Sequence, residues 1–163
     1  TAPVGIAESK GAVVKVNGYG HDEDGITTED PVTVTRMQEK LLRKGDGLAR
    51  DLDAMPTVTV TGLKGAGDTL LTWGSTAGAC REVGDALGLR VVQPVVLNPF
   101  PGERVRRALE GSHRIIAVEE NATGQLERIL PGQSIRVDGR IRKYDGRPFA
   151  LDELEARVRE VLL

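Results

Sequence analysis

The sequence has little of what builds disulfide frameworks, metal clusters or membrane spans. Its 163 residues include one cysteine, two histidines and only 3% aromatic residues. A single cysteine excludes an internal disulfide and any iron–sulfur cluster held by this chain alone. No apolar run approaches the roughly 20 residues that a membrane helix needs, and no basic-then-apolar signal segment opens the chain. We therefore expect a soluble, reduced, cytoplasmic protein.

A strong excess of charge of either sign is also lacking. The chain has 22 Lys and Arg against 24 Asp and Glu, which gives a formal net charge of −2 with both signs interspersed. This balance indicates neither nucleic acid nor a membrane surface as a partner. The length suffices for one α/β domain plus an extension, and a domain of roughly 150 residues buries about 68–70% of its unfolded surface.

A strand, a tight turn and a helix are predicted in succession after residue 69. The run from Leu70 to Trp73 is too short for a helix, and Gly74 permits a sharp turn. Ser75 or Thr76 is expected to cap the following helix. The apolar face of that helix and the glycine expected to end it follow at Cys80, Val83, Leu87 and Gly88. The apolar run 91–97 then supplies a parallel strand through a right-handed crossover.

Similar units extend over residues 56–163 and predict one compact α/β domain with a mostly parallel sheet. Expected strands cover residues 57–61, 69–73, 90–97, 114–119 and 135–143. Expected helices cover residues 76–87, 102–110 and 123–130, and a last helix carries an apolar stripe of Leu151, Leu154, Val158 and Val161.

Residues 1–55 have too little apolar content for a core of their own, and we expect an arm or linker. A short strand is predicted at 12–16, and a helix begins where Asp30 caps it and Pro31 opens it. The apolar stripe of this helix consists of Val34, Met37 and Leu41. Gly45-Asp46-Gly47 is expected to interrupt it, since glycine favours helix ends. The loop-like opening without Met is compatible with a segment of a longer polypeptide.

Three patterns suggest cofactor or metal chemistry and fail on spacing. Gly45-Asp46-Gly47 is similar to the start of a thiamine diphosphate and Mg²⁺ motif, but it follows a helix and residues 70–80 contain no Asn to complete it. The run from His21 to Asp24 fails the EF-hand spacing and indicates a solvated acidic turn. Gly65-Ala66-Gly67 precedes a strand, whereas a dinucleotide-binding glycine loop follows one.

Polar residues cluster where several expected strands end. The segment 119–125 follows one strand and should face the same edge of the sheet as residues 74–76, because the carboxyl ends of parallel strands meet there. This edge is the best candidate for a small-ligand site or an interface, and ordinary capping by Asn121 or Thr123 explains the same residues equally well. The candidate interface or site-wall residues are Gly74, Ser75, Thr76, Asn98, Glu119, Asn121 and Gln125.

Other reactive or charged residues have ordinary structural interpretations. Cys80 lies on a helical core stripe, so we expect a small buried hydrophobe instead of a nucleophile. The cationic turn from Lys143 to Pro148 could meet an anion, although turn residues alone explain it. Neither histidine has the setting of a catalytic triad, so a hydrolase is not expected. We assign no catalytic, cofactor-binding or metal-binding residue.

Several motifs together resemble the alpha subunit of 2-oxoacid:ferredoxin oxidoreductases, with the 2-oxoglutarate-using branch the closer match. In the first 55 residues they are Val14-Lys15-Val16-Asn17-Gly18-Tyr19, His21-Asp22-Glu23, Gly25, Thr28, Asp30-Pro31, Arg36-Met37 and Glu39-Lys40. Further along they are Leu71-Thr72-Trp73-Gly74-Ser75-Thr76, Asn98-Pro99-Phe100-Pro101, Glu119, Asn121, Gly124-Gln125-Leu126 and Lys143-Tyr144-Asp145-Gly146-Arg147-Pro148.

This resemblance implies a fold and a domain organisation. The fold is a three-layer α/β/α domain similar to the transketolase C-terminal domain, with a five-stranded sheet. The implied strand order is 1-3-2-4-5, with an antiparallel first strand at residues 57–61. Residues 1–55 would be the arm that follows a thiamine-binding domain, and residues 56–163 would be the transketolase-like domain.

The resemblance also implies a reaction and partners. The family oxidatively decarboxylates a 2-oxoacid with coenzyme A and oxidised ferredoxin to acyl-CoA, CO₂ and reduced ferredoxin. Thiamine diphosphate and Mg²⁺ lie between alpha and beta subunits, and iron–sulfur clusters lie on other subunits or domains, so none is expected on this chain. The segment would be a non-catalytic assembly domain that touches the beta subunit and is inactive alone. The alternative is an autonomous anion or nucleotide binder that uses helix N-termini at Ser75 and Thr123.

Overall fold

The computed structural model describes residues 18–163, so the strand expected at 12–16 lies outside the described residues. The chain divides into two compact units, residues 1–51 and residues 52–163. The elements are α1 (Pro31–Asp53), β1 (Val58–Gly62), β2 (Asp68–Thr72), η1 (Gly74–Thr76), α2 (Ala77–Leu87), β3 (Arg90–Pro94), α3 (Gly102–Leu109), β4 (Arg114–Glu119), α4 (Gln125–Ile129), η2 (Leu130–Gln133), β5 (Gly139–Arg142) and α5 (Leu151–Leu162).

The first unit contains the acidic turn, which the structure confirms. An isolated antiparallel bridge joins His21 to Thr27. Within the turn, the Asp22 carboxylate accepts backbone N–H groups from Asp24 at 3.0 Å and Ile26 at 2.8 Å. These bonds occupy Asp22 Oδ1 inside the turn, and Glu23 and Asp24 are exposed, which fits a solvated turn better than a cation site.

Helix α1 begins as expected and ends later than expected. Asp30 Oδ2 accepts the Thr33 N–H at 2.8 Å, and the helix starts at Pro31. The bonds from Thr33 hold the pKa of Asp30 below its ordinary value. The interruption predicted at residues 45–47 is wrong, because α1 runs unbroken to Asp53. Glycine keeps its N–H and can adopt helical dihedrals, so each one costs only about 1 kcal/mol relative to alanine.

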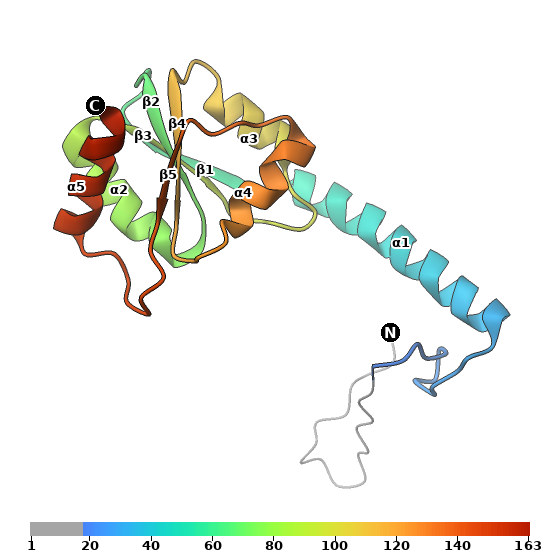
Figure 1. The fold of residues 1–163 in the computed structure, drawn as a ribbon. Helices are drawn as coiled ribbons and strands as arrows, with labels where there is room; N and C mark the ends of the chain where they lie inside the picture. Colours follow the sequence, from blue (N-terminus) through green and yellow to red (C-terminus); the bar gives the residue numbers. More distant parts are fainter. Residues whose placement is uncertain (1–17) are drawn as a thin grey trace, which may run out of the picture. The chain divides into compact units, whose positions relative to one another are not determined.

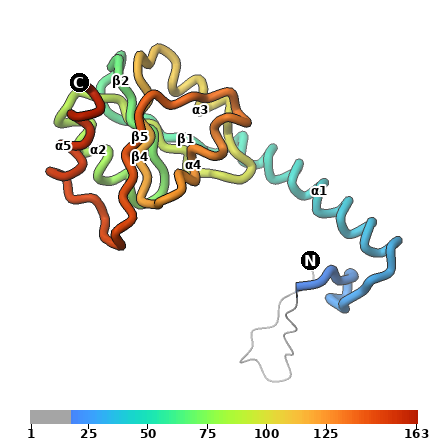
Figure 2. Tube along the Cα trace, in the orientation of Figure 1, coloured from blue at the N-terminus to red at the C-terminus, as the bar shows by residue number. Residues whose placement is uncertain are grey.

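The second unit is a five-stranded sheet between two helical layers. The strand order is β1-β3-β2-β4-β5, with β1 antiparallel to β3 and all other neighbours parallel. Helices α2 and α5 cover one face, and α3 and α4 cover the other (Figure 1; the trace is clear in Figure 2). The expected α/β class, strand order and antiparallel first strand are therefore confirmed. None of the helices within residues 18–163 is long and apolar enough to cross a membrane.

Alternate residues of each central strand supply the two cores. Leu70 and Val91 face one layer, while the next residues along, Leu71 and Val92, face the other. A sheet covered on both faces needs such continuous apolar runs. The helices pack against them through Cys80, Val83, Leu154 and Val158 in the first core and Val105, Leu109 and Leu126 in the second.

Several element boundaries differ from the sequence predictions for identifiable reasons. Strand β5 covers only residues 139–142, because its pairing with β4 begins at Ile116 and Gly139 and ends at Glu119 and Arg142. Strand β3 ends at Pro94, three residues earlier than expected. The helix predicted over 123–130 changes to a 3₁₀ turn at Leu130, where Pro131 has no N–H to continue it. Leu151 opens α5 and is exposed, so it lies outside the expected apolar stripe.

Candidate functional site

The turn after β2 opens the candidate edge and is built around a glycine. Gly74 has φ +61°, a conformation that favours glycine. The predicted side-chain cap at Ser75 or Thr76 is wrong, because neither side chain caps α2. The helix is entered through the 3₁₀ turn η1, and the Ala77 N–H bonds to carbonyls within that turn. Thr76 is buried and Ser75 is exposed.

Glu119, the last residue of β4, is fully buried and lies at the centre of the edge. Its carboxylate accepts hydrogen bonds from Trp73 Nε1 at 3.1 Å, Asn121 Nδ2 at 2.7 Å, Leu126 N–H at 2.9 Å and Glu127 N–H at 3.2 Å. Burial alone would raise the pKa of Glu119, but these four donors outweigh it and hold the pKa below the ordinary value. The side chain is therefore an ionised acceptor at neutral pH and has no proton to donate.

Asn121 caps the N-terminal end of α4. Its Oδ1 accepts the backbone N–H groups of Thr123 at 3.2 Å, Gly124 at 2.7 Å and Gln125 at 3.2 Å. Together with Glu119, it occupies all five consecutive N–H groups from residue 123 to residue 127. The predicted capping role of Asn121 is confirmed, and Thr123 is not the cap. Since these donors are already used, the alternative of an anion site at Thr123 loses its chemical basis.

Glu120 joins this loop to two others. Its Oε2 accepts a long hydrogen bond from Ser75 Oγ at 3.5 Å, and its Oε1 accepts the Phe149 N–H at 2.9 Å. The turns after β2, β4 and β5 therefore converge, as the parallel topology predicts. Asn98 and Gln125 are exposed, and no hydrogen bond within residues 18–163 joins Asn98 to the other candidates. The sequence offered no signal for the bridging role of Glu120, because it depends on contacts between distant loops.

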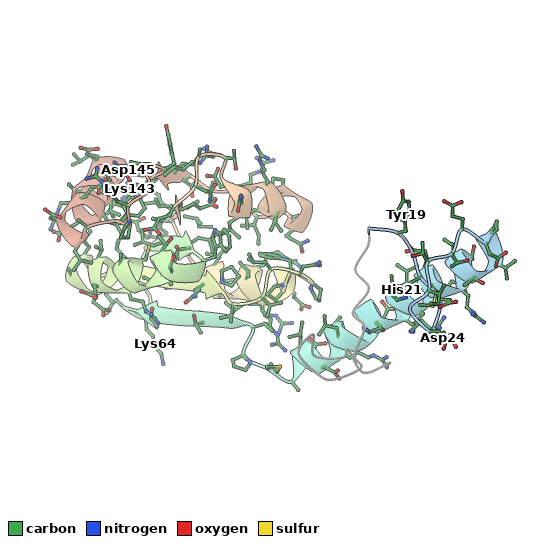
Figure 3. The ribbon with its side chains drawn as sticks, turned by 90° about the horizontal axis from the view of Figure 1, so that it is seen from below. Tyr19, His21, Asp24, Lys64, Lys143 and Asp145 are labelled. Carbon is green, nitrogen blue, oxygen red and sulfur yellow. The ribbon has the colours of Figure 1, made fainter. Side chains whose placement is uncertain are left out.

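The cationic turn after β5 is internally neutralised. Lys143 is buried and forms ion pairs with Glu153 and, at 3.6 Å, with Asp145. Figure 3 shows Lys143 and Asp145 next to each other. Arg147 binds the same Asp145 through two nitrogens at 3.2 Å and 2.8 Å. The Lys143 Nζ also lies 5.7 Å from the centre of the Phe149 ring. These pairings favour the surface-turn interpretation over an anion site.

The side chains of the described residues do not form a binding site for the metals and cofactors that the family resemblance implies for the whole enzyme. The described part of the chain, 18–163, has no group of three His, Cys, Asp or Glu side chains placed to hold a metal. Cys80 is buried, and burial raises the pKa of its thiol to about 12. Asp46 lies within α1 instead of following a strand. In the same described residues, every buried side-chain nitrogen and oxygen has a partner, so none points unpaired toward a ligand.

Comparison with known proteins gives relatives from one enzyme family. No family model matches the chain. It is 31% identical over 156 residues to the alpha subunit of 2-oxoacid:ferredoxin oxidoreductase 1 from Sulfurisphaera tokodaii, a match that covers 93% of this chain and 25% of the relative. It is 33% identical over 157 residues to the alpha subunit of 2-oxoacid:ferredoxin oxidoreductase 2 from Aeropyrum pernix, covering 93% and 24%.

A solved structure agrees on the fold. The 2-oxoglutarate:ferredoxin oxidoreductase from Magnetococcus marinus, with 2-oxoglutarate, coenzyme A and succinyl-CoA bound, aligns with a TM-score of 0.70 and 24% identity. The alignment covers 96% of this chain and 28% of that one, and at this identity it supports the fold alone. The chain spans about a quarter of the length of the curated relatives it matches. It therefore belongs to the 2-oxoacid:ferredoxin oxidoreductase alpha-subunit family, as the counterpart of one segment of those subunits.

Proposed function

We propose that this chain is a non-catalytic assembly and site-wall domain of a cytoplasmic 2-oxoacid:ferredoxin oxidoreductase alpha subunit. The whole enzyme would oxidatively decarboxylate a 2-oxoacid with coenzyme A to acyl-CoA, CO₂ and reduced ferredoxin. Residues 1–55 would be the arm from the preceding thiamine-binding domain, and residues 56–163 would be the transketolase-like domain. The identity of 31% and 33% to two curated alpha subunits, over 93% of this chain, supports this assignment.

The state of Glu119 carries the non-catalytic part of the proposal. This buried carboxylate lies at the edge where parallel sheets commonly hold ligands, yet four internal donors already occupy it. A general acid or base needs a pKa near the working pH and contact with the reacting atoms. Glu119 has a lowered pKa and is fully buried. Its role is therefore to position the loops, not to exchange protons.

The outer residues of the same edge are the ones that can touch a partner. Gly74, Ser75, Asn98 and Gln125 are exposed, while Thr76 and Glu119 are buried and Asn121 is half-buried. The buried residues fix the loop conformations, so the exposed ones are presented on a preorganised surface. We place the beta subunit, or the wall of the cofactor cleft, against these exposed residues. In this arrangement thiamine diphosphate, Mg²⁺, the iron–sulfur clusters, coenzyme A and ferredoxin contact other parts of the holoenzyme.

A segment exchange tests the proposal. The matching quarter of the Aeropyrum pernix alpha subunit is replaced by this chain and co-expressed with its partner subunits. Assembly is measured by size-exclusion chromatography, and turnover is measured as coenzyme A-dependent ferredoxin reduction. We expect an assembled, active hybrid, whereas the same subunit with the segment deleted should fail to assemble. A folded hybrid that neither associates nor turns over would contradict the proposal.

The isolated chain supplies the complementary test. We expect no ferredoxin reduction and no micromolar binding of thiamine diphosphate with Mg²⁺ by calorimetry. Micromolar binding would contradict the assignment of the cofactor to other domains. We also propose that the whole enzyme prefers 2-oxoglutarate, which the resemblance to the 2-oxoglutarate-using branch implies. A comparison of kcat/KM for 2-oxoglutarate and pyruvate in the complete enzyme tests this preference. A higher value for pyruvate would overturn that preference alone.

A further inference from the structure

Helix α1 has a seven-residue repeat along one side. Val34, Leu41 and Leu48 follow one another at intervals of seven residues within the unbroken helix Pro31–Asp53. The second set on the same side, four residues further along each time, is Gln38, Gly45 and Leu52. Spacings that alternate between four and three residues place both sets in one narrow seam. Such a seam is typical of a helix that pairs with another helix.

The opposite side of α1 repeats with the same period and different chemistry. Arg36, Arg43 and Arg50 are seven residues apart, and Glu39, Asp46 and Asp53 follow each of them three residues later. Charges of both signs repeated along a helix face are typical of a solvated surface. The seam is therefore the side of α1 with an apolar repeat, and one seam matches a single partner helix better than a surrounding bundle.

The seam is uncovered in the structure. Helix α1 contains no buried residue, and Leu41 and Leu48 are 54% and 48% exposed. Gly45 lies between these two leucines on the seam, and a Cβ added there would meet nothing within 4 Å. A small residue at that position lets another backbone approach closely. The pattern thus specifies the kind of partner, a helix with its own apolar seam, as well as the residues that contact it.

We infer that the seam of α1, formed by Val34, Leu41 and Leu48, pairs with one helix from the part of the alpha subunit outside the matched segment. This inference rests on the proposed function. The curated relatives have about three quarters of their length outside the region that this chain matches, so an alpha subunit has ample chain to supply the helix. Val34, Leu41 and Leu48 belong to one compact unit and the loop edge at Glu119 to the other, so this inference rests on different residues from the proposed function.

A photo-crosslinking experiment identifies the occupant. Benzoylphenylalanine is placed at position 41 in the complete alpha subunit that carries this segment, which is purified with its partner subunits and irradiated. Position 43, on the charged side, is the matched control. We expect crosslinks from position 41 to one helical peptide of the alpha subunit outside this chain, identified by mass spectrometry, and none from position 43.

A pair of double variants tests the energetic contribution of the seam. The double variant L41K and L48K is compared with the double variant T35K and L42K. The control adds the same charge at positions that each follow a seam residue by one and lie outside the seam. Because burial of a leucine is worth about a tenfold change in an equilibrium constant or more, the seam variant should lower the yield of assembled enzyme about tenfold or more. The control should assemble normally. Circular dichroism checks that α1 still forms in both.

The outcomes separate this inference from the proposed function. Crosslinks from position 41 to a second copy of the chain, to residues 52–163 of the same chain or to the beta subunit would overturn the seam inference. An absence of crosslinks together with equal assembly of both double variants would overturn it as well. In each of these cases, partner subunits that still co-purify leave the proposed function standing. If no oxidoreductase subunit co-purifies at all, the proposed function fails too.

Discussion

The indole of Trp73 donates a hydrogen bond to the buried carboxylate of Glu119, with Nε1 and Oε2 3.1 Å apart. Trp73 follows β2 directly and Glu119 ends β4, and these strands are parallel neighbours. The bond therefore locks together the carboxyl ends of two strands whose residues are 46 positions apart in sequence. It also makes the indole one of the four donors that keep Glu119 ionised inside the protein.

Substitution of Trp73 should be strongly destabilising. Trp73→Ala removes a large packed ring and should cost about 3–5 kcal/mol of unfolding free energy. Trp73→Phe keeps a ring but leaves the carboxylate short of one donor, which should cost about 1.5–3 kcal/mol. Urea unfolding measures both values. Tyr144→Ala, which removes an exposed ring, is the control and should stay within about 0.5 kcal/mol. An unchanged midpoint in Trp73→Ala would show that the ring does not pack at the strand end.

Glu119→Gln should cost about 1.5–3 kcal/mol at pH 7, because it replaces a charged acceptor of several N–H groups. The pKa of Glu119 lies below its ordinary value near 4.5 in the folded protein, so the folded state binds fewer protons than the unfolded one. Its contribution is complete above pH 4.5 and is lost as the pH falls through the folded pKa. The gap in unfolding free energy between wild type and variant should therefore narrow in acid. A gap that widens below pH 4.5 would contradict this account.

The thiol of Cys80 should be inert in the folded protein. Its side chain is buried, and burial raises its pKa to about 12, so almost no thiolate exists at pH 8. We expect no reaction with Ellman's reagent within an hour under native conditions and one rapid equivalent in guanidinium chloride. The denatured sample is the control for reagent access. Rapid labelling of the native chain would mean that α2 detaches from the sheet.

Much of the second unit could be predicted because the relevant signals are local. The short apolar run that begins at Leu70 and the helical spacing of Cys80 and Val83 predict elements that the structure confirms. Gly88, with φ +67°, ends α2 as predicted. Element ends were less predictable, because the ends of β5 are set by its pairing with β4, a strand about 20 residues earlier, and not by neighbouring residues.

The polar core of the candidate site was only partly predictable. Local capping by Asn121 follows from its position before a helix, and the structure confirms it. The complete burial of Glu119 could not be read from neighbouring residues, because its donors come from Trp73, Leu126 and Glu127 as well as from Asn121. In a similar way, glycines at 45 and 47 suggest a break in α1, whereas the periodic pattern on both sides of them is that of one helix.

The continuity of α1 gives a prediction at one of these glycines. Gly47 lies within the helix, away from the seam, and a Cβ added there would meet nothing within 4 Å. Gly47→Ala should therefore stabilise the helix by about 1 kcal/mol and raise the helical signal in circular dichroism. Gly25→Ala is a contrasting control, since Gly25 has φ +80° and alanine is strained there. Loss of helical signal in Gly47→Ala would contradict the continuous helix and favour the interruption predicted at residues 45–47.

Asn121 and Gln125 should separate loop positioning from partner contact. Asn121→Ala removes an acceptor of three N–H groups and a donor to Glu119, so it should cost about 2 kcal/mol, the upper end for a lost cap. Gln125→Ala changes an exposed side chain that makes no hydrogen bond within residues 18–163, and its stability should stay within about 0.5 kcal/mol. Urea unfolding of the isolated chain measures both.

In the assembled enzyme the order of the effects should change. If the exposed residues of the edge touch the beta subunit, Gln125→Ala should weaken subunit association or lower turnover despite its normal stability. Lys64→Ala, which changes an exposed side chain in the loop after the antiparallel strand β1, at the opposite end of the sheet, is the control and should assemble like wild type. Normal assembly and turnover in Gln125→Ala would leave the edge with only the capping role of Asn121, because the fold already accounts for every bond that Asn121 makes.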